Sequence, residues 1–116
     1  MYTYKAEVIR VIDGDTIKFR IDLGFRTYME ANCRLFGINC KELTAKEQEM
    51  RAAAYSAKDY VESILFEGDY VILHSRKLDK YGRPLVLVEI ELKNFGSYIL
   101  NDKMIVKGYA VKMEEY

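Results

Sequence analysis

The sequence predicts an α+β protein: a five-stranded β-barrel with one long helix between the third and fourth strands and a short C-terminal helix. Two observations predict this class. Apolar and polar residues alternate in the first third of the chain, as in strands with one buried face. The apolar spacing then becomes helical before two further strand-like segments. With 116 residues, half of them hydrophobic, the chain is expected to form one domain, 1–116, with its own core.

Three strands are expected at residues 6–12, 17–23 and 28–38. In the second, Ile17, Phe19, Ile21 and Leu23 alternate with charged residues and are expected to face inward. The Asp13–Thr16 segment before it, with its Asp-Gly pair, is typical of a hairpin turn. In the third strand one face is expected to carry Ala31, Cys33 and Leu35, and the other Asn32, Arg34 and Phe36.

A long helix is expected over residues 45–67. Thr44 and Glu47 have the spacing of a capping box, and Gly68 suits the position after a helix end. Apolar residues between them recur at helical spacing: Met50, Ala53, Ala54, Ala57, Tyr60, Val61, Ile64 and Leu65.

Two more strands are expected at 69–75 and 85–92, followed by an extended piece at 97–100. A short helix then follows, which Asn101 is expected to cap and Gly108 to end. Three strands, a helix and two closing strands is the order of the OB-fold, a five-stranded barrel that often binds nucleic acids or sugars.

The composition excludes several classes of protein. Lys and Arg number 18, as do Asp and Glu, so a protein that coats nucleic acid by bulk positive charge is not expected. Two cysteines are too few for a disulfide scaffold, and nothing near them supports a catalytic pair with His74. No apolar run approaches the ~20 residues that span a bilayer. The N-terminus lacks the apolar segment of a signal peptide, so an intracellular location is expected.

Two segments combine acids with an arginine. Asp13 and Asp15 on a tight turn could hold Ca²⁺ through oxygen ligands, although Asp-Gly is also an ordinary turn sequence. Arg34 offers a planar set of donors that suits phosphate, and Glu42, before the helix, could act as a general base. The alternative is a strand arginine paired with an acid, and a solvated loop glutamate.

A third segment, residues 76–83, is a basic loop between two strands. It contains four cations and one anion: Arg76, Lys77, Lys80, Arg83 and Asp79. A basic loop that carries an aromatic residue, here Tyr81, can hold a phosphate and stack on a base. An ordinary hairpin turn is the alternative.

Together with Met104–Ala110, these segments resemble the staphylococcal nuclease (thermonuclease) family. Its pattern is D-G-D-T, R-L-x-G-I-[DN]-x-x-E, D-x-Y-G-R and L-V-x-x-G-x-A, in that order, and the resemblance covers about residues 6–110. It implies an OB-fold and Ca²⁺-dependent hydrolysis of phosphodiester bonds in DNA and RNA that leaves 3′-phosphate ends. The expected partner is nucleic acid, preferably single-stranded.

The resemblance also implies a role for each matching residue. Asp15, Asn39 and the backbone carbonyl of Cys40 match metal ligands, with Asp13 beside them. Glu42 matches the proposed general base, Arg34 and Arg83 match phosphate-binding arginines, and Lys80 and Tyr81 match nucleotide contacts.

The chain departs from the family pattern at three places. Asn39 stands where an aspartate is commoner, Lys41 replaces a proline, and the sequence ends at Tyr116 before the longer C-terminal helix of the best-known members. Because Asn39 removes a negative charge from the metal site, a non-catalytic module that binds nucleic acid or protein is the alternative. A structural or assembly protein on the same barrel is a third. A monomer is expected, of phage, plasmid or bacterial chromosomal origin.

Overall fold

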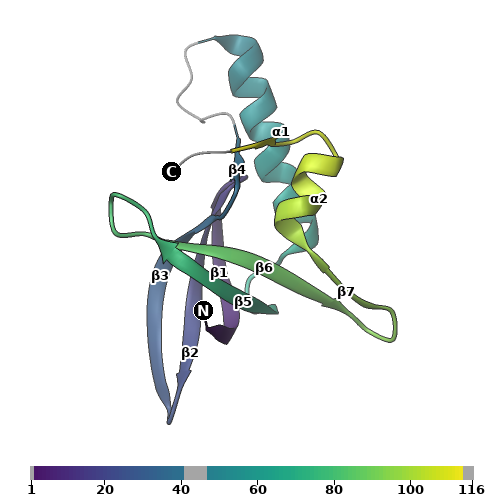
Figure 1. Cartoon of the computed structure of the whole chain (residues 1–116). Coiled ribbons are helices and arrows are strands. Elements are labelled where there is room, and N and C mark those ends of the chain that lie inside the picture. The colour runs from purple at the N-terminus through teal and green to yellow at the C-terminus, as the bar shows by residue number, and fades with distance from the viewer. Residues whose placement is uncertain (1, 41–46, 114–116) are drawn as a thin grey trace.

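The computed structural model describes residues 2–40 and 47–113 (Figure 1). Strands dominate the N-terminal half. One helix lies between the fourth and fifth strands, and a second follows the seventh strand. In chain order the elements are β1 (Thr3–Asp13), β2 (Thr16–Gly24), β3 (Thr27–Leu35), β4 (Ile38–Asn39), α1 (Gln48–Ile64), β5 (Tyr70–Leu78), β6 (Pro84–Leu92), β7 (Gly96–Ile99), α2 (Leu100–Val106) and β8 (Val111–Lys112).

Five strands close into a barrel. The sheet order is β3-β2-β1-β5-β6-β7 with antiparallel neighbours. A parallel pairing of β3 with β6 closes the barrel, with Arg34 opposite Leu85 and Leu35 opposite Val86. The predicted OB-fold is therefore confirmed. The β2–β3 and β6–β7 hairpins extend away from the closed part of the barrel (Figure 1).

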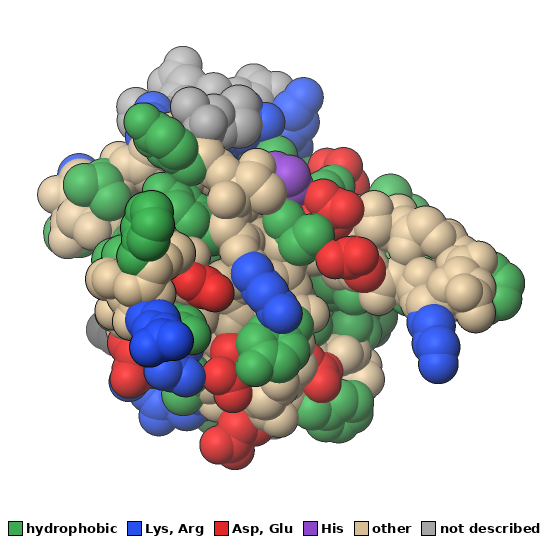
Figure 2. Space-filling model, turned by 90° about the horizontal axis from the view of Figure 1, so that it is seen from below, with side chains coloured by type: hydrophobic (Ala, Val, Ile, Leu, Met, Phe, Trp, Pro, Cys, Tyr) green, Lys and Arg blue, Asp and Glu red, His purple; other side chains and the backbone are tan. Residues whose placement is uncertain are grey.

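The barrel interior contains most of the residues that the alternating pattern predicted. Leu23 is the exception: it is 41% exposed, because the end of the β2–β3 hairpin extends beyond the closed barrel. Ile17, Phe19, Cys33, Leu35 and Leu73 are fully buried. The outward-facing positions carry charges of both signs, and Figure 2 shows acidic and basic side chains interspersed over the face seen from below.

Helix α1 packs directly on the turn between β1 and β2. Its buried residues are small, Ala54, Ala57 and Val61. A Cβ atom on Gly14 would lie 2.7 Å from Cβ of Ala57 and 3.2 Å from Sγ of Cys40. Such distances are too short for ordinary carbon contacts. Gly14 is thus required by the close approach of the helix, which holds the Asp13–Thr16 turn in place.

The helix boundaries differ from those predicted. Helix α1 begins at Gln48 with Glu47 at the N-cap position, and no side chain there makes a capping hydrogen bond. Thr44, the predicted cap, lies outside the described residues. The helix ends at Ile64 with Leu65 as C-cap, so Gly68 is not the residue after the cap. Its amide instead donates a hydrogen bond to the carbonyl of Val8 at 2.8 Å. Ala53, predicted on the apolar face, is exposed.

Asn101 does not cap α2. The N-cap position belongs to Ile99, and Asn101 lies inside the helix with its side chain buried. Its Oδ1 accepts a hydrogen bond from the amide of Val88 at 3.0 Å, and its Nδ2 donates to the carbonyls of Phe36 at 2.9 Å and Val86 at 3.0 Å. The side chain therefore joins α2 to β6 and to the turn that follows β3.

The predicted third strand, 28–38, divides at this turn. Gly37 has φ +82°, a left-handed conformation that favours glycine, and the chain resumes as β4. Strand β8, which the sequence did not predict, pairs with β4, and the amide of Met113 donates to the carbonyl of Gly37 at 2.8 Å. The segment that follows β3 is thus held by α2, through Asn101, and by β8.

In the part of the chain that the structure describes, neither helix has the length and apolar character needed to cross a membrane.

Candidate active site

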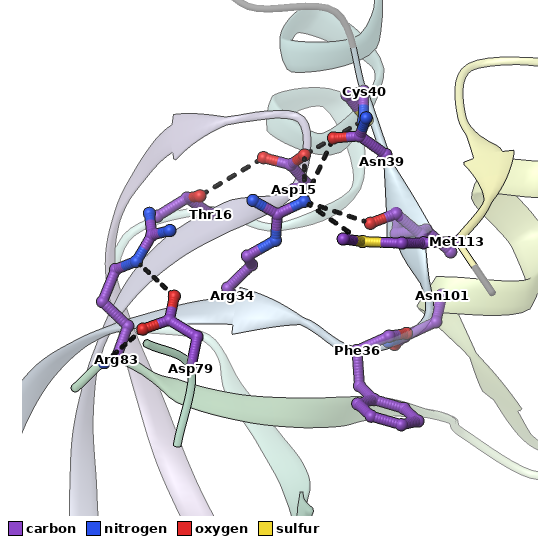
Figure 3. Close-up of polar contacts among 11 residues, drawn as sticks. Asp15, Thr16, Arg34, Phe36, Asn39, Cys40, Asp79, Arg83, Asn101 and Met113 are labelled. Carbon is purple, nitrogen blue, oxygen red and sulfur yellow. Dashed lines mark hydrogen bonds and ion pairs between the residues drawn. The ribbon is translucent and has the colours of Figure 1, made fainter. Parts of the chain in front are cut away.

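Residues from the β1–β2 turn, β3 and β4 meet at one end of β3. Asp15 lies in the turn between β1 and β2, Arg34 near the end of β3, and Asn39 on β4. Figure 3 shows their side chains pointing toward one another, with Cys40 beside them. The barrel brings these segments together, since β2 pairs with β3 and places Thr16 opposite Arg34.

Asp15 is a buried carboxylate with several partners. Only 7% of the residue is exposed. Oδ2 accepts a hydrogen bond from the amide of Cys40 at 3.0 Å, and Oδ1 accepts one from the hydroxyl of Thr16 at 3.2 Å. Nη2 of Arg34 lies 3.8 Å from Oδ2. A buried charge needs such compensation, because desolvation otherwise disfavours it strongly.

Arg34 is oriented by the segment that follows it. Its Nη2 donates to Oδ1 of Asn39 at 3.0 Å and to the carbonyl of Ile38 at 3.4 Å. Sδ of Met113 lies 3.9 Å from the same nitrogen. Among the described residues the buried Nε of Arg34 has no hydrogen-bond partner. A buried donor without an acceptor is costly, so this nitrogen suits a ligand oxygen.

Arg83 is held by Asp79 across the loop between β5 and β6. The Asp79 carboxylate accepts hydrogen bonds from Nε of Arg83 at 2.7 Å, from the Arg83 amide at 2.9 Å and from the Tyr81 amide at 2.8 Å. Burial opposes ionisation of Asp79. The backbone hydrogen bonds of Arg83 and Tyr81 and the Arg83 side chain nevertheless lower its pKa. Asp79 therefore stays ionised and fixes the guanidinium.

Sequence reasoning gave Asp79 no role of its own. An aspartate before a Gly-containing turn is ordinary turn composition, and the spacing of Asp79 and Arg83 does not reveal that the carboxylate binds both the loop backbone and the arginine. The sequence signal for this contact was that Asp79 and Arg83, which carry opposite charges, lie four residues apart. Outside a helix this spacing says little about whether two side chains touch.

Arg34 and Arg83 line one pocket of about 300 Å³, named here the arginine pocket. Two residues predicted to contact nucleotide, Lys80 and Tyr81, line it as well. The full lining is Arg34, Lys77, Leu78, Asp79, Lys80, Tyr81, Arg83 and Met113. Four cations and one anion surround the space, which favours an anionic ligand.

The residues predicted to bind a metal are partly brought together. Asp15, Asn39 and the Cys40 backbone offer oxygen donors, the kind that Ca²⁺ prefers, and Asp13 ends β1 opposite Thr16. These oxygen atoms are suitable ligands for Ca²⁺, although Oδ1 of Asn39 accepts a hydrogen bond from Nη2 of Arg34. Across residues 2–40 and 47–113 there is no group of three or more His, Cys, Asp or Glu side chains that could hold a metal ion. Glu42, the predicted general base, lies outside the described residues, as does Lys41.

The cysteines are unsuited to nucleophilic chemistry. Burial, reinforced by the charge of Asp15, raises the pKa of the Cys40 thiol to about 12, and burial raises that of Cys33 to about 12. His74 contacts Glu89 at 2.8 Å and Thr3 at 3.3 Å, residues of the neighbouring strands. Cys40 thus takes part in the candidate site through its backbone amide, which binds Asp15, and not through its thiol.

Fold and site together describe a small OB-fold protein with a pocket lined by four cationic side chains beside a buried carboxylate. The family model described as staphylococcal nuclease homologue matches residues 32–116. This is more than half of the chain, and the protein therefore belongs to the staphylococcal nuclease homologue family, as the sequence motifs predicted. The match includes Arg34, Asn39, Asp79 and Arg83 and begins after the Asp13–Thr16 turn. No curated protein matches the chain.

Proposed function

We propose that this protein is a Ca²⁺-dependent nuclease that hydrolyses phosphodiester bonds of DNA and RNA and leaves 3′-phosphate ends. The observation that carries the proposal is the arginine pocket. Two guanidinium groups line it, Arg34 from β3 and Arg83 from the loop before β6, each oriented by a carboxylate or amide oxygen. Nε of Arg34 is buried without a partner among the described residues. Guanidinium groups match phosphate geometry better than any other side chain.

In the proposed reaction Arg34 and Arg83 bind the phosphate that is cut. Negative charge accumulates on its non-bridging oxygens as the nucleophile attacks. Because Asp15 and Asp79 already orient the guanidinium groups of Arg34 and Arg83, little reorganisation is needed when this charge develops. Replacing either arginine by glutamine is expected to lower the rate on the order of 10²–10⁴-fold.

Glu42 is the proposed general base, on the strength of the sequence motif. It follows Cys40 by two residues, and the amide of Cys40 is fixed on Asp15. The Glu42 carboxylate would take a proton from the attacking water. The oxygen of the water forms a bond to phosphorus and the bond to the 5′ oxygen breaks. The 5′ oxygen takes a proton from solvent and leaves as a hydroxyl, and the phosphate stays on the 3′ side.

Asp15, Oδ1 of Asn39 and the carbonyl of Cys40, with Asp13 beside them, are the residues proposed to hold Ca²⁺. When bound, the cation would add positive charge next to the attacked phosphate. Asn39 is neutral, so the affinity for Ca²⁺ is expected to be lower than with an aspartate there. Metal binding also requires Arg34 to release Oδ1 of Asn39, which frees Nη2 for the phosphate.

Lys80 and Tyr81 are the proposed nucleotide contacts. Both line the arginine pocket, and the exposed Tyr81 ring can stack on an unpaired base. Stacking of this kind favours single-stranded DNA and RNA. The proposal treats residues 1–116 as one domain that acts as a monomer.

A non-catalytic binding module is the second candidate. The observation that favours it is the hydrogen bond in which Nη2 of Arg34 donates to Oδ1 of Asn39, because it engages the oxygen that the nuclease proposal assigns to the metal. Such a module would use the arginine pocket to bind nucleic acid without cutting it.

Cleavage of labelled single-stranded DNA with Ca²⁺ or with a chelator tests the proposal. The wild type should cut only with Ca²⁺ and yield ends that a phosphatase can dephosphorylate. Glu42→Gln and Arg34→Gln should be nearly inactive, and Arg51→Gln, on the exposed side of α1, should match the wild type. If the wild type at millimolar Ca²⁺ cuts no faster than Glu42→Gln, the nuclease proposal fails. Binding without cutting supports the second candidate.

A further inference from the structure

The β2–β3 hairpin presents a row of polar side chains that leads away from Arg34. In the strand register Arg34 lies opposite Thr16, Asn32 opposite Lys18, and Glu30 opposite Arg20. Side chains two residues apart on a strand share a face. Arg34, Lys18 and Arg20 therefore lie on the same outward face, while Ile17, Phe19 and Ile21 fill the barrel interior.

Two pairs of a cation and an aromatic ring lie farther along this face. The guanidinium carbon of Arg20 lies 4.0 Å from the ring centre of Tyr28, and Nζ of Lys5 lies 4.5 Å from that of Tyr70. Both pairs line one hollow of about 140 Å³. Tyr28 remains 48% exposed. Aromatic rings and guanidinium groups in such positions are platforms on which nucleic-acid bases stack.

We infer that this face, formed by Lys18, Arg20 and Tyr28 and named here the outer hairpin face, is a second binding stretch for single-stranded nucleic acid. Lys18 contacts a backbone phosphate, and a base stacks in the hollow at Tyr28. At about 3.4 Å per residue, Tyr28 lies about 20 Å along β3 from Arg34, so a strand of several nucleotides can occupy both. OB-folds in general bind oligonucleotides over the faces of their second and third strands. The inference rests on the proposed function.

The acidic neighbours do not prevent this binding. Lys18 lies 3.7 Å from Glu30, and Arg20 lies 3.8 Å from Glu7. Ion pairs this long and this exposed are weak and are screened by salt, so a phosphate can replace the carboxylates. The hairpin as a whole, residues 16–35, has four basic and two acidic residues, a local charge of +2 in a chain whose net charge is zero.

Equilibrium binding of a fluorescent single-stranded dodecanucleotide, measured by anisotropy in the presence of a chelator, tests the inference. For Lys18→Gln the plot of log Kd against log salt should become less steep by about 0.7, the value for one lost phosphate contact on a single strand. For Tyr28→Ala the Kd should rise roughly ten-fold. Glu30→Gln should bind more tightly than the wild type, an effect that damage to the fold cannot produce.

The β6–β7 hairpin supplies matched controls. Lys93→Gln removes a cation and Phe95→Ala removes an aromatic ring that is 83% exposed, both away from the outer hairpin face. Neither should change the Kd. The Kd of a dinucleotide that fills only the arginine pocket should be the same for the wild type and for Tyr28→Ala, whereas Arg83→Gln should raise the Kd of both the dinucleotide and the dodecanucleotide.

Two results would overturn the inference: equal effects in the β6–β7 controls and in the outer-hairpin variants, or unchanged dodecanucleotide binding in Lys18→Gln and Tyr28→Ala. In either case Ca²⁺-dependent cleavage by the wild type would leave the proposed function intact. A wild type that neither binds the dodecanucleotide nor cuts DNA would contradict both.

Discussion

The backbone amide of Cys40 donates a hydrogen bond of 3.0 Å to Oδ2 of Asp15 and so ties the segment after β4 to the turn between β1 and β2. The same carboxylate faces Arg34. A proposed metal ligand is thus also a structural acceptor, and its removal has two separable effects.

Asp15→Ala and Asp15→Asn separate these effects. Alanine leaves the buried Cys40 amide without an acceptor and should lower the free energy of unfolding by about 1–3 kcal/mol. Asparagine keeps an oxygen acceptor and should lower it less, yet it removes the charge that a cation needs. Urea unfolding measures the first effect and calorimetric titration with Ca²⁺ the second. The interpretation is wrong if Asp15→Ala unfolds at the same urea concentration as the wild type.

Gly14 is expected to tolerate no side chain. A Cβ there would meet Cβ of Ala57 at 2.7 Å, and overpacking of this kind costs about 1–3 kcal/mol. Gly14→Ala should therefore unfold at lower urea. Ala57→Gly removes the opposing methyl group but costs about 1 kcal/mol as a glycine inside a helix. The double variant should therefore lose less free energy of unfolding than the two single variants lose together. Simple additivity of the two single variants would show that the contact is not the cause.

The barrel could be predicted because strand alternation depends only on near neighbours. The alternate spacing of Ile17, Phe19 and Ile21 was enough to predict that their side chains are buried. Asn101 could not be assigned in this way: an asparagine before an apolar run is compatible with a helix cap, and only the packing of α2 on β6 reveals its three hydrogen bonds. Strand β8 has two residues, too few for any periodicity.

The site shows the same division. The types of residue and their motifs indicated Arg34 and Arg83 as phosphate ligands, but their presence in one pocket follows from the parallel pairing of β3 with β6, a contact between distant segments. The pairing of Asn39 with Arg34 was not foreseen, because a motif gives the order of residues and not the partner that each side chain finds.

Asn101 is expected to be one of the most sensitive polar positions. Asn101→Leu keeps the approximate volume but removes three hydrogen bonds and takes the Asn101 acceptor from the Val88 amide. The Val86 carbonyl keeps its hydrogen bond from the Phe36 amide. With about 1 kcal/mol for each lost hydrogen bond, the free energy of unfolding should fall by at least about 2 kcal/mol. Lys107→Ala, at the exposed end of α2, should change it by less than about 0.5 kcal/mol. A loss in Asn101→Leu no larger than in this control would contradict the role assigned to the side chain.

Both cysteines should resist alkylation in the folded protein. Burial raises the pKa of each thiol to about 12, so the reactive thiolate is scarce near neutral pH. Iodoacetamide should modify neither until urea unfolds the chain. Ser56→Cys places a thiol on the exposed side of α1 and should react in the folded state at the rate of a free thiol. Mass spectrometry distinguishes the sites, and rapid modification of Cys40 in the native wild type would contradict its burial.

Asp79 should make stability depend on acid pH. The hydrogen bonds from Arg83 and Tyr81 hold its pKa below the usual value, which in an unfolded chain is about 3.9. A carboxylate with a lowered pKa in the folded state stabilises the fold above its unfolded pKa, and this contribution disappears as the pH falls through the folded pKa. Below about pH 4 the free energy of unfolding of the wild type should therefore fall more steeply than that of Asp79→Asn. Arg83→Lys loses the Nε hydrogen bond and should lie between the two. Identical acid limbs for the wild type and Asp79→Asn in urea unfolding at several pH values would show that the Asp79–Arg83 contact does not form in solution.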